Sequence, residues 1–255
     1  FKCDWSSDVC SSDLIHDLYL AMGRGDVGGF TVPAINVRAM AYDTARAVIR
    51  AAKKVNAGAF IFEIARSEIG YTEQRPHEYA AILFAAALRE GFTGPLFIQG
   101  DHVQTNAKKY NSPERDKELD TLRALIREEI AAGFYNIDID TSTLVDLDKP
   151  TLAEQQEVNV TLAADFAAYI RSVEPAGVTV SIGGEIGEVG GKNSDIHELH
   201  CYMDGLNAKL TERGVAVGIS KISVQTGTAH GGVITNPAAI TEVFEKGLAR
   251  ARQLA

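Results

Sequence analysis

The chain has 255 residues, of which 45% are hydrophobic and 23% charged, so it is long enough to bury one substantial core. Its formal net charge of −9 argues against a large nucleic-acid-binding surface, because Lys and Arg are scattered among acids rather than clustered. No apolar run approaches the roughly 18 residues needed to span a membrane. We therefore expect a cytoplasmic protein without nucleic-acid or membrane partners.

The N-terminal segment differs from the rest of the chain. Residues 3–14 (CDWSSDVCSSDL) have neither helical nor strand periodicity and resemble the translation of a sequencing adapter. We therefore assign residues 1–14 to a non-native segment and residues 15–255 to one domain. Cys201 then remains as the only native thiol, which supports neither a disulfide framework nor a cysteine metal site.

From about residue 30 onward, short β-branched apolar runs alternate with amphipathic stretches, a pattern typical of βα units and a parallel sheet. The apolar runs predict strands over residues 30–36, 59–64, 96–100, 135–140, 178–182 and 221–225. The amphipathic stretches predict helices over residues 42–55, 77–89, 113–132, 151–173, 195–213 and 237–254.

Polar residues follow several of these predicted strands instead of gathering at one switch point, which favours a barrel over an open doubly wound sheet. We therefore predict a (β/α)₈ TIM barrel, with about six of the eight βα units present in this chain. The sequence predicts that the chain is truncated, with the last two units expected beyond residue 255.

Two histidines follow predicted strands in glycine-rich sequence, His102 after the third strand and His230 after the sixth. Both could bind Zn²⁺, but a catalytic zinc site uses three protein ligands, and either histidine could equally be an ordinary polar residue at a strand end. Asp101 should face away from His102 on an extended strand, unless the strand ends there. It could then act as a general acid or base, or make a cap hydrogen bond.

Two other patterns involve glycine and histidine. Residues 183–191 are too rich in glycine for a helix and predict an active-site loop, but they lack the strand–turn–helix context of a dinucleotide site. His197 and His200 flank Glu198 on a predicted helix, where a solvated face is a more ordinary interpretation than a metal pair.

Five motifs occur in one order along the chain: 32–37 (VPAINV), 100–102 (GDH), 139–142 (IDTS), 184–191 (GEIGEVGG) and 227–231 (GTAHG). Together they resemble the class II fructose/tagatose-bisphosphate aldolases. The resemblance implies a homodimeric zinc enzyme that cleaves a ketose phosphate through an enediolate of dihydroxyacetone phosphate.

The resemblance also implies roles for individual residues. His102 and His230 resemble two of three catalytic zinc ligands, and Asp101 resembles the acid/base at the aldehyde-derived hydroxyl. The remaining implied roles are ligands of a second metal for Asp140 and Glu185, and contacts with substrate, phosphate or a monovalent cation for Asn36, Ser67 and Gly231.

The sequence also departs from the family pattern. The loop at 191–195 lacks the usual paired acids, which leaves the proton-abstracting base open, and residues 232–235 lack a basic residue that would favour a bisphosphate. The third zinc histidine and a strand-eight phosphate motif would lie beyond Ala255. Alternatives are a noncatalytic sugar-phosphate-binding relative, or an isomerase or epimerase on the same fold.

Overall fold

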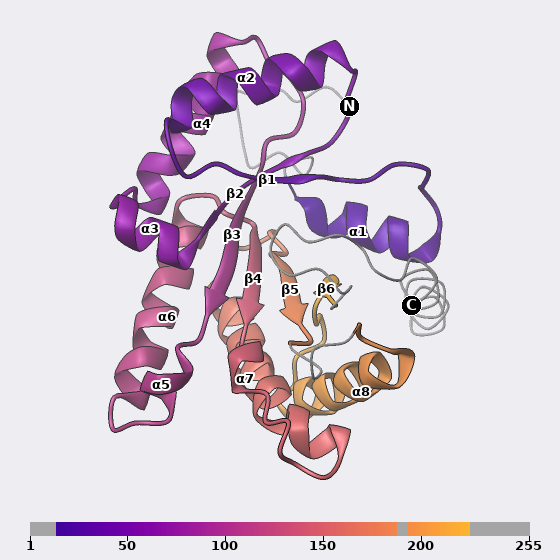
Figure 1. Ribbon diagram of the computed structural model, residues 1–255. Helices are drawn as coiled ribbons and strands as arrows, with labels where there is room; N and C mark the ends of the chain where they lie inside the picture. Colours follow the sequence, from indigo (N-terminus) through magenta and orange to yellow (C-terminus); the bar gives the residue numbers. More distant parts are fainter. Residues whose placement is uncertain (1–13, 188–192, 225–255) are drawn as a thin grey trace.

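The computed structural model describes residues 14–187 and 193–224 of the chain. Their strands form one sheet in which each strand pairs in parallel with the next strand along the chain, from β1 to β6 (Figure 1). This arrangement is an α/β half-barrel. The strands are β1 Ala34–Asn36, β2 Ile61–Ala65, β3 Phe97–Gln104, β4 Asn136–Asp140, β5 Ser181–Glu185 and β6 Lys221–Ser223.

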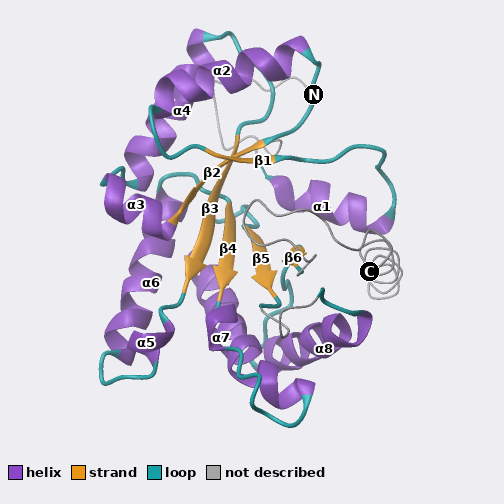
Figure 2. Cartoon of the chain, in the orientation of Figure 1, coloured by secondary structure: helices purple, strands orange, loops and turns teal. Residues whose placement is uncertain are grey.

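Helices connect the strands and cover one face of the sheet, as expected for parallel βα units (Figure 2). Among the described residues, no helix combines the length and the apolar character needed to cross a membrane. The connecting helices are α2 Ala41–Lys54, α3 Arg66–Thr72, α4 Pro76–Arg89, α5 Ala107–Tyr110, α6 Arg115–Ala131, α7 Leu152–Val173 and α8 Ile196–Glu212, with a short 3₁₀ turn η2 at Ser142–Leu144.

The strand sequences explain this layering. Side chains alternate between the two faces of a strand, and one set, including Phe62, Ile98 and Ile182, is buried in the main core with the covering helices. The alternate set contains Glu63, Gln99 and Asp138 at neighbouring positions of the sheet. The half-barrel therefore has an apolar outer face and a polar inner face, and the inner face is where a site can form.

Helix α1 (Ile15–Arg24) was not predicted from the sequence. Its Ile15 packs on Ile61 and Phe97, the first residues of β2 and β3, with Leu18 and Tyr19 beside them. These three α1 residues have the spacing of one helix face. The helix therefore covers the N-terminal ends of the strands, opposite to the end where polar residues gather.

Most predicted elements are present, with shifted ends. The predicted strand at 178–182 is observed as β5 at Ser181–Glu185, and β3 runs on to Gln104 instead of ending at residue 100. The short helices α3 and α5 were missed. The predicted helix at 237–254 lies outside the described residues.

Glu129 of α6 is a buried carboxylic acid next to β3. Its side chain is 0% exposed, and neither carboxyl oxygen has a hydrogen-bond partner among the described residues. A methyl group on Gly100 would lie 2.6 Å from its Oε2, so the glycine makes room for the carboxyl. Burial, followed by the nearby charge of Glu128, raises the pKa of Glu129 to about 8.

We predict that Glu129→Gln removes a pH-dependent loss of stability. Between the ordinary carboxyl pKa and about 8, Glu129 keeps its proton in the folded chain and releases it in the unfolded chain. The free energy of unfolding therefore falls as pH rises through this range, by on the order of 5 kcal/mol. Urea unfolding of both proteins at acidic and alkaline ends of the range measures the difference.

The matched control for that measurement is Glu212→Gln, because the Glu212 side chain is 64% exposed. The control should keep the pH dependence of the wild type. An E129Q variant with the same pH dependence as the wild type would show that Glu129 does not hold its proton in the folded chain.

Candidate metal centre at the strand ends

A bulge in β3 aims two neighbouring side chains at one place. The register between β3 and β4 shifts between Gly100 and Val103, and His102 has a φ of 43°, in the left-handed region that non-glycine residues rarely adopt. Asp101 and His102 consequently both line the same cavity of ≈ 150 Å³. Sequence reasoning expected them to diverge unless the strand ended at Gly100; the strand continues, and the bulge brings them together instead.

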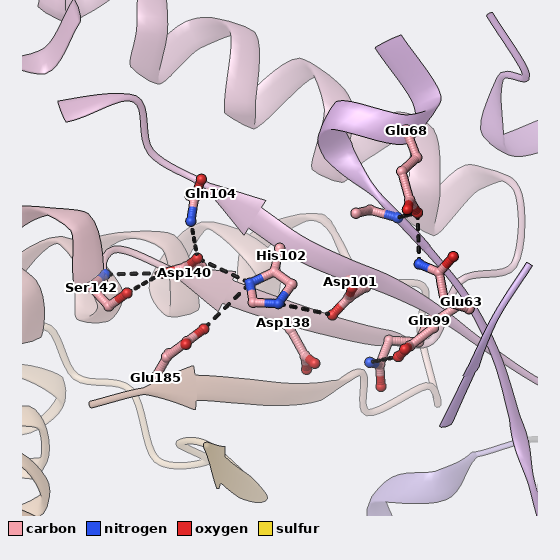
Figure 3. A network of polar contacts seen from close by, with 12 residues as sticks. Glu63, Glu68, Gln99, Asp101, His102, Gln104, Asp138, Asp140, Ser142 and Glu185 are labelled. Carbon is pink, nitrogen blue, oxygen red and sulfur yellow. Dashed lines mark hydrogen bonds and ion pairs between the residues drawn. The ribbon is translucent and has the colours of Figure 1, made fainter. Parts of the chain in front are cut away.

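His102, Asp140 and Glu185 form a compact group of donor atoms. They come from β3, β4 and β5, and their ligand atoms all lie within 4.8 Å of one another (Figure 3). His102 Nδ1 is 3.1 Å from Asp140 Oδ2 and 3.5 Å from Glu185 Oε2. Asp101 lies on the other side of the ring, with its Oδ1 3.8 Å from His102 Nε2.

Asp140 is fixed from several directions. Its Oδ2 accepts a hydrogen bond from Gln104 Nε2 at 2.6 Å, and its Oδ1 accepts from the Ser142 hydroxyl at 2.6 Å and the Ser142 backbone N–H at 3.1 Å. The residue is 1% exposed. Such outer contacts orient a metal ligand and limit its movement.

The charges of this group favour a cation between the two carboxylates. The hydrogen bond to Asp140 outweighs burial and raises the pKa of His102 to about 10. Burial, and then the charge of Asp140, raises the pKa of Glu185 to about 7. Burial alone would also raise the pKa of Asp140, but hydrogen bonds from His102, Ser142 and Gln104 lower it.

A protonated imidazole therefore supplies the positive charge between two carboxylates. A divalent metal would supply the same charge with a neutral histidine, and one imidazole with two carboxylates is a donor set that suits Zn²⁺ and related ions. The residues present thus fit a metal. The sequence expectation placed His102 at one metal position and Asp140 with Glu185 at another, whereas the structure gathers all of them into one group.

The family model described as "Fructose-bisphosphate aldolase class-II" matches residues 22–248, which include every strand of the sheet and all three residues of the metal group. The chain belongs to the class II fructose-bisphosphate aldolase family. The resemblance seen in the five sequence motifs is thereby confirmed. A comparison with curated proteins gave no match for this aldolase-family chain.

Among solved structures, the aldolase-family chain is similar to a probable tagatose 6 phosphate kinase from Sinorhizobium meliloti 1021. The TM-score is 0.60 at 20% sequence identity, over 78% of this chain and 50% of that one. At this identity the likeness concerns the fold alone. The chain spans about half the length of that structure.

Asn36 and Ser67, the two substrate-binding candidates among the described residues, lie in different surroundings. Asn36, at the end of β1, donates through Nδ2 to Glu68 Oε2 at 2.6 Å, and its buried Oδ1 has no partner among the described residues. Ser67 of α3 lines a second cavity of ≈ 430 Å³, which also borders His102 and Arg66. His230 and Gly231 lie outside the described residues, so their roles stay predictions.

Sequence reasoning missed a ladder of polar side chains below the metal group. Gln99 Nε2 donates to Glu63 Oε2 at 2.6 Å, Asn136 Nδ2 donates to Gln99 Oε1 at 2.6 Å, and Lys221 Nζ also donates to Gln99 Oε1. Lys221 Nζ lies 2.6 Å from Asp138 Oδ1. Burial, then the Asp101 charge, raises the pKa of Glu63 to about 7. The ladder could have been predicted from the polar residues that interrupt the otherwise apolar strand sequences.

Proposed function

We propose that this protein is a metal-dependent aldolase that reversibly cleaves a ketose mono- or bisphosphate to dihydroxyacetone phosphate and an aldehyde. The observation that carries the proposal is the group of His102, Asp140 and Glu185 at the strand ends of a chain in the class II aldolase family. In barrels of this kind, catalytic groups sit at the C-terminal ends of the strands.

In this proposal, the metal is Zn²⁺, held by His102, Asp140 and Glu185 together with His230. When bound, Zn²⁺ supplies a Lewis acid that polarises the substrate carbonyl. Asp101 moves a proton at the aldehyde-derived hydroxyl, a role supported by its place in the same cavity and outside the metal group. The resemblance assigns Asp140 and Glu185 to a second metal position, and in this proposal they share one ion with His102 instead.

The other proposed contacts concern substrate and assembly. Asn36 would accept a hydrogen bond from a substrate hydroxyl through its Oδ1, which has no partner among the described residues, since its Nδ2 donates to Glu68. Ser67 would contact substrate from the second cavity, and Gly231 would help to bind phosphate and a monovalent cation. We further propose that the fold is a (β/α)₈ barrel with about six of its eight units in this chain, that residues from 15 onward form one domain, and that the protein is a cytoplasmic homodimer.

The testing experiment is retro-aldol cleavage by the zinc-loaded protein, measured against a panel of ketose mono- and bisphosphates. We expect release of a triose phosphate that stops on addition of a chelator and returns with Zn²⁺. Binding without turnover would contradict the proposal in favour of a noncatalytic sugar-phosphate-binding protein. A product with unchanged carbon number would favour an isomerase or epimerase.

A further inference from the structure

Lys221 lies one layer below the metal group, on the same inner face of the half-barrel. Asp138 and Asp140 are two residues apart on β4, as Gly183 and Glu185 are on β5, and such residues share one face of a strand. In the register of the sheet, Gly183 pairs with Asp138 on one side and with Lys221 on the other. Asp138, Gly183 and Lys221 therefore form one layer of the barrel interior.

Gly183 leaves space for the Lys221 side chain to extend across β5. Lys221 starts on β6, yet its Nζ reaches Asp138 Oδ1 on β4 at 2.6 Å and Gln99 Oε1 on β3. A methyl group on Gly183 would lie 2.9 Å from Lys221 Cε and would also collide with the Asp138 carboxylate. Any side chain at residue 183 would close the path of the lysine.

Lys221 also faces the cavity that contains the candidate catalytic groups. The ≈ 150 Å³ cavity is lined by Asp101, His102 and Glu185 as well as by Asp138 and Lys221. Among its described lining residues, Lys221 is the only lysine or arginine, and its side chain is 22% exposed. The layer thus places one fixed ammonium next to the metal group.

The Lys221 ammonium keeps an N–H group that can donate to a ligand. It carries three N–H groups, of which one donates to Gln99 Oε1, while Asp138 Oδ1 faces the ammonium in an ion pair. The Tyr19 ring of α1, centred 5.9 Å from Nζ, covers the lysine from the helix that packs on the N-terminal strand ends. A structural ion pair needs neither a third donor nor access to a cavity, whereas a substrate-binding cation needs both.

We infer that Lys221 is a further catalytic residue, whose third N–H donates to the substrate oxygen that gains negative charge when a proton leaves the carbon beside the ketone. Asp138 and Gln99 are positioning residues that hold the ammonium in place, and Gly183 opens its path. The ligand class is a hydroxyketone phosphate. This inference rests on the proposed aldolase function.

The test is deuterium exchange into dihydroxyacetone phosphate in D₂O, followed by NMR with the zinc-loaded full chain. Exchange reports removal of the substrate proton without carbon–carbon cleavage. Lys221→Met should lower the exchange rate by about 10²-fold, the usual cost of removing one oxyanion donor, with unchanged zinc content. Lys221→Arg should recover part of the rate, and Lys117→Met, at an exposed lysine of α6, should leave it unchanged.

Gly183→Ala provides an independent variant that keeps the lysine but blocks its path, so it also serves if Lys221→Met fails to fold. It should lower exchange as Lys221→Met does. Wild-type exchange rates in folded Lys221→Met or Gly183→Ala would overturn the role of Lys221 and leave the aldolase proposal standing. A wild-type protein that binds zinc but neither exchanges nor cleaves would overturn the proposed function, and the inference with it.

Discussion

Replacement of His102 by alanine is expected to abolish zinc binding and retro-aldol activity together. His102 contributes the only nitrogen ligand of the described metal group, and its Nδ1 lies between Asp140 and Glu185. Without the ring, the buried Asp140 carboxylate and the half-buried Glu185 carboxylate would face each other, and their repulsion would favour protonation of one of them. The remaining pair is too few for a catalytic zinc site.

The measurement is zinc content by elemental analysis on the same samples used for the cleavage assay. His197→Ala is the matched control, because His197 is exposed on α8 and its side chain lies outside the metal group. The control should keep both zinc and turnover. Stoichiometric zinc in His102→Ala would show that the metal binds elsewhere in the chain.

The layers of the fold could be predicted from the sequence because the apolar positions repeat at the period of each element. Runs such as 59–64 and 135–140 have the β-branched content of buried strands, and the amphipathic stretches between them have helical spacing. The same pattern brought Asp140 and Glu185 to the strand ends. Parallel strands place their C-terminal ends at one edge, so their convergence followed from the topology.

The bulge at His102 could not be predicted, because nothing local in the sequence requires a φ of 43° at a histidine. That conformation is imposed by the shifted pairing of β3 with β4, which is a property of the assembled sheet. The bond between Lys221 and Gln99 joins residues 122 positions apart, so it too depends on register. Helix α1 was missed because it begins directly beside a segment excluded from fold reasoning.

His230 is the sequence candidate for a further zinc ligand, and it lies outside the described residues. The described group has one imidazole, whereas the family resemblance implies a site with three histidines. If His230 binds the same ion, His230→Ala should lose zinc and turnover as His102→Ala does.

Asp101→Asn should keep zinc and lose turnover. Asp101 lies 3.8 Å from His102 Nε2 and lines the same cavity, but its carboxylate is not part of the metal group. Burial raises the pKa of Asp101, so its carboxyl keeps a proton to higher pH than an ordinary aspartate. An asparagine of nearly equal size keeps the packing but cannot exchange a proton, so kcat should fall by at least about 10²-fold.

The comparison of zinc content with kcat separates the roles of two adjacent residues. Asp148→Asn, at an exposed loop position, is the matched control and should keep wild-type values of both. Loss of zinc in Asp101→Asn would make Asp101 a metal ligand, which its position outside the group of His102, Asp140 and Glu185 argues against. Full turnover with zinc retained would assign the proton transfer to another group of the cavity.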